Sequence, residues 1–173
     1  TVQELVQLSQ RKPGYVNFGS PGVGTPHHMA MELFKLESKT FMLHVPYRGS
    51  AGYTQDLLGG EIMVGFLPVH VAQGFVKSGR LVPLAVGSTQ RHPVAPDVPT
   101  FMEAGYKGID VDLWYGFFVP AKTPAAVATK LSAELAGIMK EPAVREVLGK
   151  AGMDARSSTP EELQQMAQQD YQR

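Results

Sequence analysis

The chain has 173 residues, 43% of them hydrophobic and 18% charged, which is enough apolar material for one domain or two small lobes. Its 16 basic and 16 acidic residues cancel, so the sequence predicts no nucleic-acid partner and no anionic membrane surface, and a charged ligand must be bound by local groups. Cysteine is absent, which excludes disulfides and cysteine metal sites, and we expect neither a membrane-spanning run of roughly 18 to 20 apolar residues nor a signal peptide in this sequence.

The predicted elements begin with a helix and a strand. Thr1 and Glu4 are spaced as a capping box, which predicts a helix over residues 1–10. Residues 15–18 favour a strand, and the glycines and the proline of residues 19–24 end it. The strand therefore leads into a loop whose N–H groups are free of bulky side chains.

A second helix follows this loop directly. Thr25 is a suitable N-cap, and Pro26 fits the first helical position. Such a helix start presents unpaired N–H groups and the positive end of the helix dipole, so it suits a carboxylate or a phosphate. The same pattern occurs in α/β proteins without an anion site, so a purely structural role for this loop stays open. The residues expected to form its apolar stripe are Met29, Ala30, Leu33, Phe34 and Leu36.

The order of strand, glycine loop and helix then repeats. Residues 40–47 favour a strand until Pro46 removes a donor, and residues 48–60 form a glycine loop and a helix that a final glycine stops. A short strand at residues 61–66 and a helix at residues 69–78 come next. The approximate doubling indicates two similar loops on one scaffold.

The second half of the chain begins with short elements. A fourth strand is predicted at residues 81–87, followed by a proline-rich connection and a short helix at residues 101–104. Residues 109–119 are rich in aromatic side chains and predict a long crossing strand. Helices are expected over residues 123–140, 142–151 and 159–172. Strands alternating with helices predict an α/β fold.

The two glycine loops carry the candidate ligand site. Loops at the C-terminal ends of strands converge in the usual crevice of an open α/β sheet, where hydroxyl and N–H groups orient the oxygen atoms of a small anion. Arg48 either adds charge or is a solvated surface residue, and His28 either donates to the ligand or packs as a satisfied polar side chain. The candidate ligand-binding residues are Ser20, Gly22, Gly24, Thr25 and His28 in the first loop and Tyr47, Arg48, Gly49 and Ser50 in the second.

The sequence offers no convincing catalytic, metal or cofactor set. The segment from Gly22 to His27 matches half of a dinucleotide fingerprint, but His27 replaces the third glycine and no acidic residue ends the second strand. The five histidines include no i,i+4 pair, which argues against a metal site. Asp110 and Asp112 have the chemistry for acid/base work, but a pair beside Trp114 is more often a solvated strand edge. We therefore expect no catalytic residues, no metal and no cofactor.

Seven motifs in chain order resemble the substrate-binding receptors of tripartite tricarboxylate transporters, the Bug type. The resemblance implies a type II periplasmic-binding-protein fold with two α/β lobes that close on a small carboxylate. It also implies a periplasmic location and delivery of the ligand to a membrane permease without catalysis. The motifs are Gly19-Ser-Pro-Gly-Val-Gly-Thr-Pro-His-His28, His44-Val-Pro-Tyr-Arg-Gly-Ser50, Asp56-Leu-Leu-Gly-Gly60, Leu84-Ala-Val86, Pro96-Asp-Val-Pro-Thr100, Trp114-Tyr-Gly-Phe-Phe-Val-Pro120 and Ser158-Thr-Pro-Glu161.

The same resemblance implies a division of the chain. Residues 1–108 correspond to a nearly complete second, ligand-binding lobe, and residues 109–173 to a crossing strand and C-terminal helices of the first lobe. Family members begin with an export signal and with most of the first lobe, whereas this sequence starts within the second. We therefore expect either self-association through the incomplete lobe or that the chain is part of a longer receptor.

Two positions depart from the family pattern and bear on the ligand. The family usually carries an acidic residue near position 63 and a polar one near position 67, where Met63 and Leu67 stand here. A more apolar pocket favours an aromatic or hydrophobic acid over a hydroxylated tricarboxylate, because polar ligand groups would lie unpaired.

Two competing functions stay open: a nucleotide-dependent enzyme that uses the Gly22/Gly24 loop, and a receptor-derived sensory or interaction module.

Overall fold

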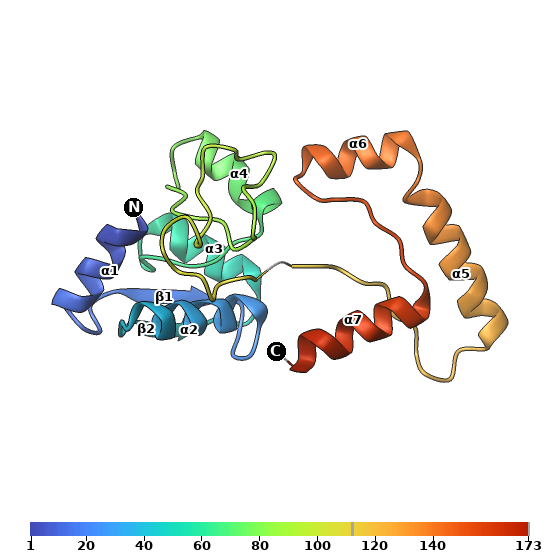
Figure 1. Cartoon of the computed structure of the whole chain (residues 1–173), viewed down its shortest axis with the longest axis horizontal. Helices are drawn as coiled ribbons and strands as arrows, with labels where there is room; N and C mark the ends of the chain where they lie inside the picture. The colour runs from blue at the N-terminus through green and yellow to red at the C-terminus, as the bar shows by residue number, and fades with distance from the viewer. Residues whose placement is uncertain (112, 173) are drawn as a thin grey trace. The chain divides into compact units, whose positions relative to one another are not determined.

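The computed structural model describes residues 1–111 and 113–172, which divide into two compact units. Unit 1 is Thr1–Leu113 and unit 2 is Trp114–Arg173. Among the described residues, no helix combines the length and the apolar character needed to cross a membrane. The elements labelled in Figure 1 are α1 (Val2–Arg11), β1 (Asn17–Ser20), α2 (Pro26–Ser38), β2 (Leu43–Pro46), α3 (Ser50–Gly59), α4 (Val69–Lys77), α5 (Ala125–Ile138), α6 (Pro142–Lys150) and α7 (Pro160–Gln172).

The first helix of unit 1 is confirmed with its capping box. The Thr1 side chain accepts a hydrogen bond from the Glu4 N–H at 3.2 Å, and the Glu4 carboxylate accepts from the N-terminal ammonium group. One face of α1 then contributes to a core shared with β1 and α2. The buried members of this core are Val2, Val6, Val16, Phe18, Met31, Phe34, Met42, Phe101 and Ile109.

The sheet of unit 1 is parallel. β1 pairs with β2 from Asn17↔Leu43 to Ser20↔Pro46. On the other side of β1, Phe18 forms a parallel bridge with Val64. Three chain segments therefore run side by side in the same direction, with β1 in the middle, and their C-terminal ends lie at one edge of the sheet.

The strand predicted at residues 61–66 is reduced to this single bridge. The carboxamide of Asn17 donates to the Glu61 carbonyl oxygen at 2.9 Å and accepts from the Met63 N–H at 2.8 Å. A side chain thus takes hydrogen bonds that a regular ladder would give to backbone groups. The segment stays beside β1 without forming a regular strand, because one side chain has replaced part of the ladder.

Three other predicted elements differ in the structure. The strand at residues 81–87 retains one bridge, Val86↔Thr100, and the expected helix at residues 101–104 is a series of turns. No described residue of 109–119 belongs to a strand, although Ile109 is buried in the core of unit 1. Strands depend on neighbouring strands for their hydrogen bonds, and Pro83 also lacks a donor.

The buried face of α2 differs from the predicted stripe. Met29 and Leu36 are 58% and 74% exposed, so these two positions were wrong. Residues spaced by four positions on one face, together with Met31, form the interior side of the helix. The buried residues of α2 are Ala30, Met31, Phe34 and Ser38.

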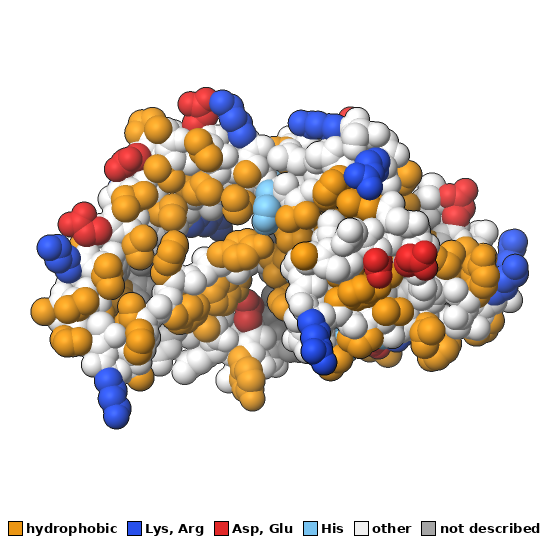
Figure 2. Space-filling model, turned by 180° about the vertical axis from the view of Figure 1, so that it is seen from behind, with side chains coloured by type: hydrophobic (Ala, Val, Ile, Leu, Met, Phe, Trp, Pro, Cys, Tyr) orange, Lys and Arg blue, Asp and Glu red, His pale blue; other side chains and the backbone are white. Residues whose placement is uncertain are grey.

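Unit 2 consists of an extended segment and the helices α5, α6 and α7. The capping box of α7 is confirmed, since the Thr159 N–H donates to the Glu162 carboxylate at 2.8 Å and the Glu162 N–H donates to the Thr159 hydroxyl at 3.2 Å. Phe117 and Phe118, in the extended segment, are each 70% exposed. Hydrophobic side chains are spread over the surface of unit 2, at the left in Figure 2.

Candidate ligand-binding site

The structure brings the two glycine loops together at the C-terminal edge of the parallel strands. The Tyr47 N–H donates to the Ser20 carbonyl oxygen at 3.0 Å, and the Gly49 N–H donates to the Pro21 carbonyl oxygen at 2.9 Å. These bonds continue the pairing of β1 and β2 beyond the strands. The backbones of the two loops are therefore held next to each other before any ligand binds.

The first loop is organised by its own hydrogen bonds. Ser20 is fully buried, and its hydroxyl donates to the Gly22 carbonyl oxygen at 3.0 Å. The Thr25 hydroxyl donates to the same oxygen at 2.7 Å and accepts from the His28 N–H at 3.4 Å, as an N-cap of α2. Gly24 has a φ of 77°, a conformation that favours glycine. The loop therefore has a defined shape that its side chains and glycines maintain.

His28 stabilises this loop from behind. Its Nδ1 accepts a hydrogen bond from the Gly24 N–H at 3.1 Å, and its Nε2 lies 3.7 Å from the Glu32 carboxylate. The imidazole also stacks on His44 with ring centroids 4.1 Å apart. These contacts correspond to the packing alternative for His28, while a direct contact with a ligand stays a prediction.

His44, which is not among the residues predicted for the site, lies under the first loop. Its Nε2 is 2.7 Å from the Ser20 hydroxyl, and its ring also stacks on Phe18 at 4.7 Å. Burial, followed by the charges of His28 and Lys35, lowers the pKa of His44, although Glu32 acts in the opposite direction. A neutral imidazole at this position supports the buried Ser20 without bringing a charge. The available signal was the strand pairing itself, which sets His44 opposite Phe18.

A second histidine, His27, lies in the first turn of α2. Its Nδ1 is buried and has no hydrogen-bond partner among the described residues, and its ring meets Tyr53 edge-on at 6.4 Å. Burial lowers the pKa of His27. This side chain is therefore neutral near pH 7 and contributes no charge to the loop.

The second loop presents a helix start with no side-chain cap. Gly49 is the N-cap of α3 with a φ of 110°, and no side chain accepts a hydrogen bond there. The N–H groups of the first turn, beginning at Ser50, have no intrahelical acceptors by the geometry of an α-helix. Arg48 is exposed beside them. This combination suits an anionic oxygen.

Tyr47 differs from its neighbours because its hydroxyl has a protein partner. The hydroxyl donates to Asp56 Oδ2 at 2.6 Å, and this bond raises the pKa of Tyr47 to about 12. Asp56 lies on α3, the helix that the second loop begins. The phenol is thus occupied within the protein, while the Tyr47 backbone joins the two loops.

A third helix start lies near the same edge. The segment through Val64 runs parallel to β1 and leads to Pro68, the N-cap of α4, which also lacks a side-chain cap. Leu67 is partly buried just before it. The starts of α2, α3 and α4 therefore follow the C-terminal ends of three adjacent parallel segments, an arrangement that concentrates N–H donors without a cluster of charged side chains.

The other places with site-like features offer less chemistry. Among the described residues, no group of three histidine or acidic side chains is arranged to hold a metal ion. Asp112, one of the two acidic residues considered for acid/base work, lies outside the described residues.

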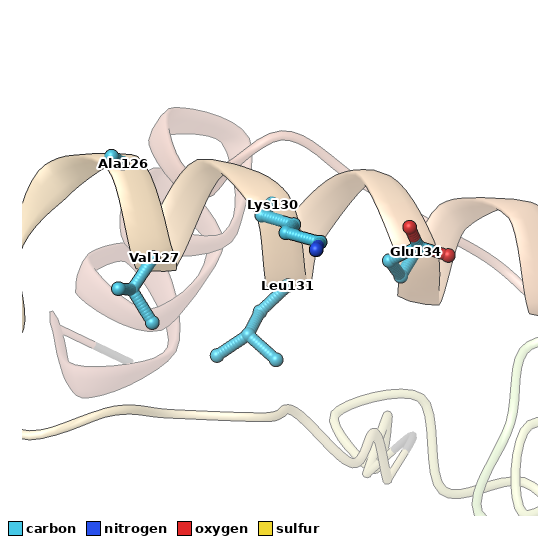
Figure 3. A pocket seen from close by; sticks show the side chains of 5 residues that line it. All are labelled: Ala126, Val127, Lys130, Leu131 and Glu134. Atoms are coloured by element: carbon cyan, nitrogen blue, oxygen red, sulfur yellow. The ribbon is translucent and has the colours of Figure 1, made fainter.

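An open hollow on unit 2 is lined by residues of α5 alone, with Val127 and Leu131 pointing to the same side (Figure 3). One helix face without converging polar groups is not a ligand site.

Known proteins resemble this chain over its whole length. The family described as "Tripartite tricarboxylate transporter family receptor" matches residues 1–173. A relative from Pseudomonas sp. strain P51, described as "UPF0065 protein in tcbD-tcbE intergenic region", is 35% identical over 163 residues, which cover 94% of this chain and 48% of the relative.

Solved structures of similar proteins share the fold. R. palustris Rpa4515 with adipate has a TM-score of 0.92 at 26% identity, covering 97% of this chain and 56% of that one. The periplasmic binding protein BugD has a TM-score of 0.90 at 28% identity, with 97% and 57% covered. MatC from Rhodopseudomonas palustris with bound malate has a TM-score of 0.85 at 26% identity, with 97% and 58% covered.

These likenesses confirm the α/β periplasmic-binding-protein fold that the motifs implied. The chain spans about half the length of the relatives that it matches. A match that extends from the first residue to the last, together with the paired loops, identifies the chain as a member of the tripartite tricarboxylate transporter receptor family.

Proposed function

We propose that this chain is part of a solute-binding receptor that captures a small carboxylate and delivers it to a tripartite tricarboxylate-type membrane permease. The observation that carries the proposal is the direct hydrogen bonding of the two glycine loops, which fixes the uncapped start of α3 beside the first loop. Backbone N–H groups at helix starts bind carboxylates without a charged side chain. The adipate and malate named for two structural relatives support this ligand class.

The proposed role is binding without catalysis. A reaction needs a poised nucleophile, acid or base in the crevice. At this edge Ser20 is fully buried with its hydroxyl donating to the Gly22 carbonyl oxygen, so it is not presented as a nucleophile, and the Tyr47 hydroxyl is bound to Asp56. The location proposed is the periplasm, as BugD is described.

The proposed ligand is a carboxylate with an apolar or aromatic body. Leu67 stands at the end of the segment that leads to α4, and Met63 is 45% exposed earlier in that segment. Apolar side chains leave ligand hydroxyl groups without partners, which costs free energy on binding. Affinity for citrate above that for adipate or benzoate would contradict this choice of ligand.

Each unit has a different proposed place in the receptor. Residues 1–108 are proposed for the second lobe and residues 109–173 for the first, although the structure groups residues 109–113 with unit 1, where Ile109 lies in the core. The exposed Phe117 and Phe118 and the apolar side of α5 support this assignment, because side chains of this kind are normally covered. The rest of a first lobe is the proposed cover.

Thermal unfolding with a panel of acids tests the proposed function. A ligand that binds the native state raises the unfolding midpoint by mass action. We expect a saturable rise with adipate or benzoate and a smaller one with citrate. Arg48→Ala should reduce the rise, and Arg80→Ala, another arginine of unit 1, serves as the matched control. A rise with NAD alone would favour the nucleotide-dependent enzyme, and no rise with any acid would contradict carboxylate binding by this chain.

A further inference from the structure

Tyr47 and Asp56 form a hydrogen-bonded pair across the second loop. The phenol hydroxyl donates to Asp56 Oδ2 at 2.6 Å, a charge-assisted bond of a kind that is stronger than one between neutral groups. Asp56 lies seven residues after the N-cap Gly49, within the second turn of α3. The pair therefore ties the residue before the loop to the body of the helix after it.

The surface of α3 is shaped to receive the Tyr47 ring. Gly52 and Asp56 are four positions apart and lie on one face of the helix. A Cβ added at Gly52 would lie 3.2 Å from Tyr47 Cδ1, so the missing side chain gives the ring its place. The ring also lies at an angle to that of Tyr53, with centroids 6.3 Å apart. Ring and hydroxyl together fix the direction in which the chain enters α3.

The same residue is joined to the first loop through its backbone. The Tyr47 N–H donates to the Ser20 carbonyl oxygen, and two residues later the Gly49 N–H donates to the Pro21 carbonyl oxygen. A change in the position of Tyr47 is therefore transmitted to both loops. Asp56 also fixes the other end of α3, where its carbonyl oxygen accepts from the Gly60, Glu61 and Ile62 N–H groups.

We propose that Tyr47 and Asp56 are positioning residues that set the spacing of the two carboxylate-binding loops, with the phenol bound to Asp56 and not to the ligand. This inference rests on the proposed function for its ligand. The geometry that it describes belongs to the free protein and can be measured without one.

Amide hydrogen exchange of the full chain, with and without adipate, tests the pair. Tyr47→Phe and Asp56→Ala should speed exchange of the hydrogen-bonded loop amides by about tenfold, the factor that corresponds to ~1.4 kcal/mol and to the loss of one charge-assisted hydrogen bond. These amides are those of Gly22, Gly24, Thr25, Tyr47 and Gly49. Exchange in α1 should stay unchanged. Asp56→Asn keeps an acceptor oxygen and should restore slow exchange in the loops.

The matched control is Tyr15→Phe, which removes a hydroxyl from an exposed tyrosine of the same unit. Faster exchange in both loops and in α1 alike would show a merely structural role and overturn the inference, as would unchanged exchange in the loops. Adipate should slow loop exchange in the unsubstituted chain and do so more weakly in Tyr47→Phe. If adipate has no effect on the unsubstituted chain, the carboxylate proposal fails, while the exchange rates without ligand still decide the role of the pair.

Discussion

At the scale of single residues, Gly19 shows how closely β1 is packed. A Cβ added at this position would overlap Ile62 Cδ1 and would lie 2.7 Å from Tyr53 Cδ2. Both neighbours are buried, with Tyr53 fully enclosed, so neither side chain has room to move. The absence of a side chain at position 19 is therefore a packing requirement beneath the glycine loop.

Gly19→Ala is expected to lower the free energy of unfolding by about 1–3 kcal/mol, because the added methyl group overpacks the interior. Gly74→Ala is the matched control, since a Cβ there meets no atom within 4 Å and the position lies inside α4. Replacing a helical glycine should raise stability by about 1 kcal/mol. Urea unfolding of both variants measures the difference, and equal effects would contradict the packing account.

Two partly buried histidines predict a pH dependence of stability. The pKa values of His27 and His44 are lowered from 6.5 by burial, so between the folded and unfolded values the unfolded chain binds more protons. The free energy of unfolding should therefore fall as the pH drops through about 6.5 and should level off below the folded pKa values. The lowered pKa values of Glu4 and Glu103 affect a window below 4.5.

Urea unfolding between about pH 7.5 and about pH 5.5 measures this dependence. His27→Gln and His44→Gln should each flatten the loss of stability, because the substituted side chain does not titrate. Gln90→Asn, which replaces one non-titrating side chain by another just before the proline-rich connection, is the control and should leave the slope as it is. Stability that stays constant or rises toward acidic pH would show that the two histidines are not held neutral by burial.

At the scale of secondary structure, the start of α2 joins a cap to a loop. The Thr25 hydroxyl accepts from the His28 N–H and donates to the Gly22 carbonyl oxygen. Thr25→Ala should lower the free energy of unfolding by about 1 kcal/mol, and Thr25→Ser, which keeps the hydroxyl, should have little effect. Chemical denaturation compares the two. Equal losses in both variants would mean that the methyl group, and not the cap, stabilises this turn.

Helices were predicted well because their signals are local. Capping boxes at Thr1 and Thr159 and the N-cap at Thr25 mark three helix starts within a few residues of sequence. The strand predicted at residues 61–66 is reduced to one bridge, and the strand predicted at residues 109–119 was wrong for the described residues. A strand depends on partners that local sequence does not reveal. The Asn17 carboxamide, which replaces ladder bonds beside β1, has no signature in its own neighbourhood.

In the candidate site, too, local features could be predicted from the sequence and long-range contacts could not. The glycine loops were found because glycine, proline and a cap stand close together in the sequence. His44 and Asp56 were missed as supports, since each acts through a residue that is distant along the chain, Ser20 and Tyr47 respectively. The buried face of α2 was partly wrong because apolar residues occur on more than one side of that helix, and only packing selects among them.

At the scale of the whole molecule, unit 2 presents exposed apolar side chains. Phe117, Phe118 and Val119 are exposed in its extended segment, as are Val127 and Leu131 on α5. Exposed patches of this kind mark surfaces that associate. The behaviour of the isolated chain in solution should therefore be set by this unit.

We expect the isolated chain to associate with itself in a concentration-dependent way, as measured by sedimentation velocity. Replacing Phe117 and Phe118 together with serine should shift the distribution toward monomer, because the substitution removes exposed apolar area. Tyr15→Ser is the control, since Tyr15 is an exposed aromatic residue of unit 1. A chain that stays monomeric and melts sharply at high concentration would contradict the expected association.

The central claim is that the paired glycine loops bind a carboxylate through backbone N–H groups. Backbone amide NMR shifts during titration with adipate test it most directly. We expect saturable shifts concentrated in residues 21–25 and 48–52, with α6 and α7 unchanged. Shifts confined to other parts of the chain, or loop shifts that appear with NAD and not with adipate, would contradict it.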